Sequence, residues 1–75
     1  MTAEPIRVLI ADDDKVVRWA LKMLLADANG IAVTAEASGG REAVALVEKL
    51  RPHVVLIGCT LPDPRLPRGR TAREV

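Results

Sequence analysis

Aromatic residues are almost absent: the chain of 75 residues has one tryptophan, Trp19, and no phenylalanine or tyrosine. Apolar residues still make up 49% of the chain, so any core must be aliphatic. The single cysteine, Cys59, cannot form an intrachain disulfide, which excludes a disulfide-stabilised scaffold. No apolar run approaches the ~18 residues of a membrane span, and the acidic N-terminus does not resemble a secretory signal. We therefore expect a cytoplasmic protein that makes no membrane contact.

Neither positive nor negative charge is in excess, because the formal net charge is only +1. Such a balance favours neither nucleic acid nor acidic partners over the chain as a whole. The C-terminal segment carries four arginines, but no aromatic residue is interleaved with them and no recognition helix accompanies them (Arg65, Arg68, Arg70 and Arg73). We expect no direct nucleic-acid binding by this segment.

Two nearly continuous apolar runs, at residues 6–11 and 53–58, predict strands that are covered on both faces. Residues 31–37 alternate between apolar and polar side chains, which favours an edge strand. Between these runs lie two helical patterns. The first follows Asp14, a candidate N-cap, and places Val17, Leu21, Leu24, Leu25 and Ala28 on one face. The second spans residues 41–50, with Ala43, Val44, Val47 and Leu50 directed inward.

The resulting β-α-β-α-β order predicts an α/β fold with a parallel sheet in the order 2-1-3. Ligands of such sheets bind at the carboxyl ends of the strands, where the strand order reverses. Here that point lies between the first and third strands. We therefore expect Asp12, Asp13 and Gly58 around one crevice.

The last residues differ in character from the rest of the chain. We divide the sequence into a domain at residues 1–62 and a proline- and arginine-rich tail at residues 63–75, disordered or beginning a further helix near Thr71. Nothing in this tail predicts a partner for the outer edge of the strand at 53–58. We expect that edge to be exposed and available to a second copy or another protein, or the chain to be the front part of a larger domain.

The stretches "IRVLIADDD", "AEASGGREAVALVEKL" and "RPHVVLIGCTLP" resemble, at the same spacing, the receiver domain of bacterial two-component response regulators, especially those that precede a helix-turn-helix DNA-binding domain. The resemblance implies a truncated, CheY-like (flavodoxin-like) fold without its fourth and fifth strands. It also implies phosphorelay signal transduction from a sensor histidine kinase, with no enzymatic activity of the chain's own. In this family Mg²⁺ is held by the positions of Asp12, Asp13 and the backbone carbonyl of Thr60. The phosphoacceptor position is Gly58.

Glycine at the acceptor position departs from the family, because an acyl phosphate needs a carboxylate oxygen as nucleophile. The leading hypothesis is thus a degenerate receiver that cannot accept phosphate and binds Mg²⁺ only weakly. A second hypothesis is a pseudo-receiver interaction module, which would use the edge of the third strand or an outward surface at Trp19 and Met23. A third is a non-functional gene fragment.

Overall fold

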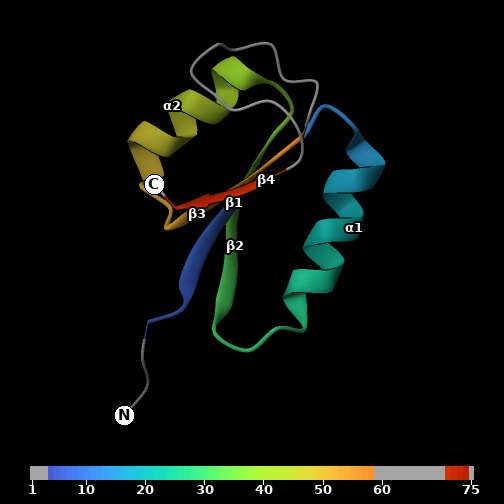
Figure 1. Cartoon of the computed structure of the whole chain (residues 1–75), viewed down its shortest axis with the longest axis vertical. Coiled ribbons are helices and arrows are strands. Elements are labelled where there is room, and N and C mark those ends of the chain that lie inside the picture. The colour runs from blue at the N-terminus through green and yellow to red at the C-terminus, as the bar shows by residue number, and fades with distance from the viewer. Residues whose placement is uncertain (1–3, 59–70, 75) are drawn as a thin grey trace.

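The computed structural model describes residues 4–58 and 71–74. In chain order its elements are β1 (Ile6–Ala11), α1 (Lys15–Ala26), β2 (Ile31–Ala37), α2 (Gly40–Leu50), β3 (Val54–Ile57) and β4 (Thr71–Glu74). The predicted β-α-β-α-β order is confirmed by the first five elements. Figure 1 shows the two helices on opposite sides of the strands.

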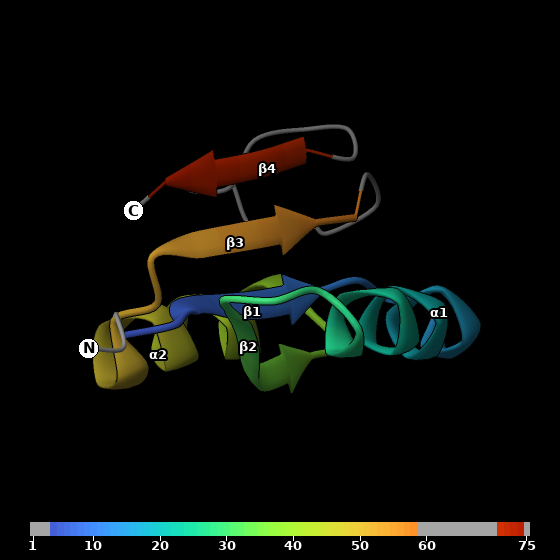
Figure 2. The same ribbon diagram turned by 90° about the horizontal axis from the view of Figure 1, so that it is seen from below.

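The strands form one sheet in the order β2-β1-β3-β4. β1 pairs in parallel with both β2 and β3, so the predicted 2-1-3 order is confirmed. In Figure 2 the arrows of β1, β2 and β3 point the same way and that of β4 points back. The helices pack on β1 and β2 (Figure 2), which leaves the β3–β4 side of the sheet without a comparable helical layer among the described residues.

The prediction that β3 has a free outer edge is wrong. β4 pairs with β3 in antiparallel register over its whole length, from Val54 opposite Glu74 to Ile57 opposite Thr71. The backbone groups of β3 on this side need partners, and an antiparallel strand supplies them without a crossover helix. The expectation of a helix beginning near Thr71 is wrong for the same reason, as is pairing of a second copy along this edge. Residues 63–70 of the predicted tail, like residues 59–62 before it, lie outside the described residues.

The core lies mainly between the sheet and α2. Its members are small or aliphatic, as the composition requires: Leu9, Ala11, Ala37, Ala43, Val55 and Ile57. Leu9 and Ala11 alternate along β1 with Val8 and Ile10, which are also buried. Successive strand residues point to opposite faces, so β1 is covered on both. This explains why residues 8–11 of β1 are all apolar.

One predicted core residue of α1 lies on the surface. Leu24 is 72% exposed, whereas Val17, Leu21 and Leu25 are half-buried. Leu24 stands at the margin of the inward stripe. Among the described elements α1 packs only on β1 and β2, so none of these covers that margin. Trp19 and Met23 point outward as predicted, at 59% and 53% exposure.

No helix within the described residues is long and apolar enough to span a membrane.

Candidate functional site

The carboxyl ends of β1 and β3 meet at the edge of the sheet where the sequence predicts a crevice. Ala11 is aligned with Ile57 across the parallel pair, and the backbone N–H of Gly58 donates to the carbonyl of Ala11 over 2.6 Å. Asp12 directly follows β1, so the register brings its side chain beside Gly58. The sequence prediction that these two positions adjoin is confirmed by this geometry.

The contact between them is unusually close. Asp12 is only 2% exposed. A Cβ atom built on Gly58 would lie 2.5 Å from both Cγ and Oδ2 of Asp12, and 2.9 Å from its Oδ1. These separations are far below van der Waals contact. The carboxylate of Asp12 therefore occupies the space that any side chain at position 58 would need.

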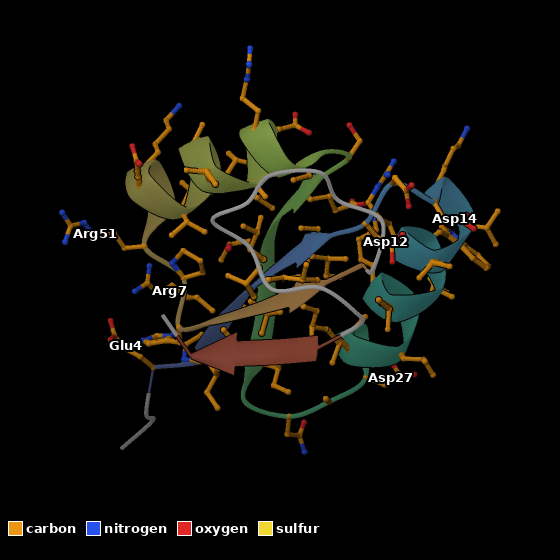
Figure 3. All side chains as sticks on the ribbon, turned by 45° about the horizontal axis from the view of Figure 1, so that its top comes forward. Glu4, Arg7, Asp12, Asp14, Asp27 and Arg51 are labelled. Carbon is orange, nitrogen blue, oxygen red and sulfur yellow. The ribbon has the colours of Figure 1, made fainter. Side chains whose placement is uncertain are left out.

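Asp12 also orders the loop into α1. Its Oδ1 accepts the backbone N–H of Asp14 at 2.9 Å, and its backbone carbonyl accepts from Nη1 of Arg18 at 2.6 Å. Asp14 in turn is the N-cap of α1, as predicted, and its Oδ1 accepts from the N–H groups of Val16 and Val17 at 2.9 and 3.3 Å. In Figure 3 the side chains of Asp12 and Asp14 lie at the start of α1. The carboxylates of Asp12 and Asp14 thus fix the beginning of the helix.

Replacing Asp14 with alanine is expected to lower the free energy of unfolding by about 1 kcal/mol, because two N–H groups of the first turn lose their acceptor. Chemical denaturation followed by circular dichroism measures the loss. Asp14→Ser keeps a capping oxygen and should recover most of it. An equal loss in both variants would contradict the capping role.

The described residues do not fit a tightly held magnesium ion. Asp12 is buried and its Oδ1 is committed to the Asp14 amide, while Asp13 is exposed. No group of three or more His, Cys, Asp or Glu side chains comes together within the described part of the chain. The predicted third ligand, the carbonyl of Thr60, lies outside the described residues. Weak binding of Mg²⁺ through Asp13 stays a prediction.

An ion-pair cluster beside this loop was not predicted from the sequence. Glu36 of β2 accepts a hydrogen bond from Nζ of Lys22 at 2.8 Å, and its other oxygen lies 3.6 Å from Nε of Arg18. The hydrogen bond from Lys22, together with the charges of both cations, lowers the pKa of Glu36. Arg18 thereby joins β2 to the carbonyl of Asp12. The spacing of Lys22 and Arg18 on one helix face was the only available signal, and their partner becomes evident only in the fold.

The opposite end of the sheet carries a different set of polar contacts. Arg7 and His53 exchange two hydrogen bonds of 2.8 Å, from the Arg7 N–H to Nδ1 and from the His53 N–H to the Arg7 carbonyl. A surface groove adjoins them, lined by Val47, Glu48, Arg51, Pro52 and His53. Figure 3 places Arg7 and Arg51 at the end of the sheet away from Asp12. The groove is thus separate from the acidic loop.

The family model and the curated relatives that match this chain indicate the same family. Residues 8–66 match the family model of the response regulator receiver domain. Response regulator GacA of Pseudomonas protegens is 39% identical over 57 residues, which are 76% of this chain and 27% of that protein. The nitrate/nitrite response regulator NarL of Escherichia coli K12 is 36% identical over 59 residues, or 79% of this chain and 27% of NarL. The chain thus spans about a quarter of the length of these curated relatives.

A solved structure shares the fold. The isolated REC domain of RcsB from Salmonella enterica serovar Typhimurium, in the presence of phosphomimetic BeF3−, superimposes with a TM-score of 0.76 at 23% identity. The match covers 88% of this chain and 48% of that one. A protein-glutamate methylesterase/protein-glutamine glutaminase of Alkalilimnicola ehrlichii is 38% identical over 58 residues, but these are only 15% of its length.

Proposed function

Because the chain belongs to the response regulator receiver family of two-component systems, we propose that it is a receiver domain that does not accept a phosphoryl group at the end of its third strand. The observation that supports this most directly is the environment of Gly58. Its position at the end of β3, beside Asp12, is where the family resemblance puts the acceptor carboxylate. Glycine offers no nucleophile there.

The packing adds a second reason. In a phosphorylatable site the acceptor side chain must reach the crevice from position 58. In this chain the Asp12 carboxylate fills that volume and is held there by the Asp14 amide. A receiver domain that keeps the sheet and the loop, but in which the Asp12 carboxylate fills the space beside Gly58, would transmit no phosphorylation-dependent change from this point. It would signal only through contacts with other proteins.

The family supports further parts of this proposal. We place the chain in the cytoplasm, in the lineage of proteins that interact with sensor histidine kinases, and assign it no catalytic activity of its own. The esterase named for one relative is an activity of that protein as a whole, of which the match covers a small share. We assign Mg²⁺ at most weak binding near Asp13, and no step depends on it.

The test is direct phosphorylation. The chain is incubated with acetyl phosphate and Mg²⁺, and separately with a phosphorylated histidine kinase, and its intact mass is measured. We expect no addition of a phosphoryl group. A receiver domain with an aspartate at the end of its third strand, treated in parallel, should be phosphorylated and so shows that the donors are active.

A hydroxylamine-sensitive phosphoryl adduct on this chain at stoichiometric yield would overturn the proposal. Peptide mapping then identifies the acceptor, and Asp13→Asn is the variant that tests the more exposed carboxylate of the loop. Addition of phosphate that survives in this variant and in Asp12→Asn would place the acceptor elsewhere in the chain.

A second candidate function is a pseudo-receiver that acts by protein contact. The observation that favours it is the outward surface of α1, where Trp19 and Met23 are more than half exposed. Tryptophan is enriched among residues that anchor interfaces. The route through the edge of β3 is not proposed again, since β4 occupies that edge.

A further inference from the structure

The amino ends of β1 and β3 are joined through the side chain of His53. Regular pairing of the two strands begins at Val8 and Val54. One residue earlier, the backbone N–H of His53 donates to the carbonyl of Arg7 at 2.8 Å, and the N–H of Arg7 donates to Nδ1 of the His53 ring at 2.8 Å. In a regular parallel pair both bonds would be made by backbone groups. We call these two bonds the Arg7–His53 pair.

The turn from α2 into β3 explains why a side chain is used here. In a regular parallel ladder the N–H of Arg7 would bond to the carbonyl of Arg51, two residues before His53. Arg51 instead caps α2 in the left-handed conformation, with a φ of 49°, and its N–H donates to the carbonyl of Val47 at 2.9 Å. The guanidinium of Arg7 also bonds to this turn, since Nη1 donates to the Leu50 carbonyl at 2.8 Å. The ring nitrogen thus takes the place of a backbone carbonyl.

We propose that the Arg7–His53 pair is a pH-sensitive switch, which is closed while the His53 ring is neutral and opens when the ring is protonated. A neutral imidazole has one nitrogen that donates and one that accepts. Because Nδ1 accepts from Arg7, the proton of the neutral ring is on Nε2. Protonation of Nδ1 converts the acceptor into a second donor that faces the N–H of Arg7, so this hydrogen bond is lost. The inference goes beyond the proposed function and does not depend on it.

The sign of the pH dependence follows from the bond. The folded chain gains this hydrogen bond only with the neutral ring, and the unfolded chain has no such bond to lose. Its contribution to stability is therefore complete at pH values above the titration of the ring and is lost as the pH falls through it. Histidine side chains titrate between about pH 5 and pH 8. The switch thus operates near neutral pH.

Charged residues from the neighbouring elements influence the pH at which the switch opens. Carboxylates favour the protonated ring, and cations favour the neutral one. The charged residues at this end of the sheet are Glu4 and Arg7 at the start of β1, Glu48, Lys49 and Arg51 at the end of α2, and Glu74 in β4, which is aligned with Val54 (Figure 3). Both signs are present, so these groups move the midpoint, whereas the loss of the bond follows from protonation of Nδ1 itself.

Nitrogen-15 NMR of the purified chain tests the switch directly, because His53 is the only histidine. At pH 8 we expect Nδ1 to resonate as an unprotonated nitrogen and Nε2 as a protonated one. The amide proton of Arg7 should shift upfield as its hydrogen bond is lost, over the same pH range in which the ring titrates. The amide of Gly58, which bonds to the carbonyl of Ala11 at the other end of β3, is the internal control and should not follow the ring.

His53→Asn is the matched variant. Its side-chain carbonyl oxygen stands as far from Cα as Nδ1 does, accepts a hydrogen bond and does not titrate. Urea denaturation at pH 8 and pH 5.5 compares the two chains. Between these values the equilibrium constant for unfolding should rise about two- to fivefold more in the wild type than in His53→Asn, a modest factor because His53 is exposed. His53→Ala, which lacks the acceptor, should lack this additional pH dependence and be less stable than the wild type at pH 8.

An equal pH dependence of stability in the wild type and in His53→Asn would overturn the inference, as would a ring that carries its proton on Nδ1 at pH 8. A wild type that gains stability over His53→Asn as the pH falls would also overturn it, because the protonated ring would then pair with a carboxylate. Glu48→Gln and Glu74→Gln would identify that carboxylate. None of these measurements involves phosphorylation, so their outcome leaves the phosphate-incompetent receiver untouched.

Discussion

Replacing Gly58 with alanine is expected to destabilise the protein, although glycine-to-alanine changes at compatible positions usually stabilise by reducing the entropy of the unfolded chain. The new Cβ would lie 2.5 Å from Cγ of Asp12, so the carboxylate must move. Moving it breaks the hydrogen bond to the Asp14 amide and disturbs a side chain that is 2% exposed. Overpacking of this kind costs about 1–3 kcal/mol, and we expect a net loss of at least about 1 kcal/mol.

A double-mutant cycle isolates the contact. Asp12→Ala removes the carboxylate and will itself destabilise the loop. In that background Gly58→Ala should cost little, which gives a coupling free energy of about 1 kcal/mol or more between the two positions. Gly39→Ala is the matched control, because a Cβ at Gly39 meets nothing within 4 Å. As an N-cap substitution it should cost less than about 1 kcal/mol.

Urea denaturation of the four chains, followed by circular dichroism, supplies the cycle. If Gly58→Ala lowered the free energy of unfolding equally with and without the Asp12 carboxylate, the clash would not be the cause.

The same contact between Asp12 and position 58 limits any attempt to restore a phosphoacceptor. Gly58→Asp adds a second carboxylate against the first, so we expect it to fold less stably than Gly58→Ala. Regaining a phosphorylatable site would require Asp12 to adopt a different rotamer as well.

The position of this contact could be predicted from the sequence, but its closeness could not. Asp12 and Gly58 each follow an apolar run, and parallel neighbours end at the same edge of a sheet. Alternation of strands and helices therefore placed the two residues together. The rotamer of Asp12 depends on the amide of Asp14 and on the space left by glycine. Those are properties of the packed loop, not of the sequence pattern.

The other features that the sequence did not predict correctly also depend on tertiary packing. Nothing in Thr71–Glu74 indicates a strand by itself, since four residues with two charges have no periodic signal. Its state is decided by the unpaired backbone of β3, which is a tertiary effect. Leu24 fits the helical stripe by spacing, and its exposure depends on how few elements surround α1. The ion pairs of Glu36 likewise depend on the distance between α1 and β2.

Leu9→Ala is expected to have the largest effect on stability. Leu9 is fully buried at the centre of the sheet, where it is aligned with Ala35 of β2 and Val55 of β3. Removing a buried leucine side chain costs about 2–5 kcal/mol, since a cavity remains that the neighbours fill only in part. A domain of this size has a total stability at or below the lower end of the usual ~5–15 kcal/mol. We therefore expect a large unfolded fraction without denaturant.

Leu24→Ala provides a control with the same chemical change at a position that is 72% exposed. It should alter the free energy of unfolding by less than about 0.5 kcal/mol, because little apolar area is uncovered and alanine is the better helix former. Both variants are measured by urea denaturation at low micromolar concentration, so that association does not contribute. If Leu9→Ala does not fold at all, Leu9→Val reads the same position with an expected loss of about 1 kcal/mol. If Leu9→Ala and Leu24→Ala lowered the free energy of unfolding by similar amounts, the core would not lie between β1 and α2. The placement of Asp12 beside Gly58, which depends on that packing, would then also be wrong.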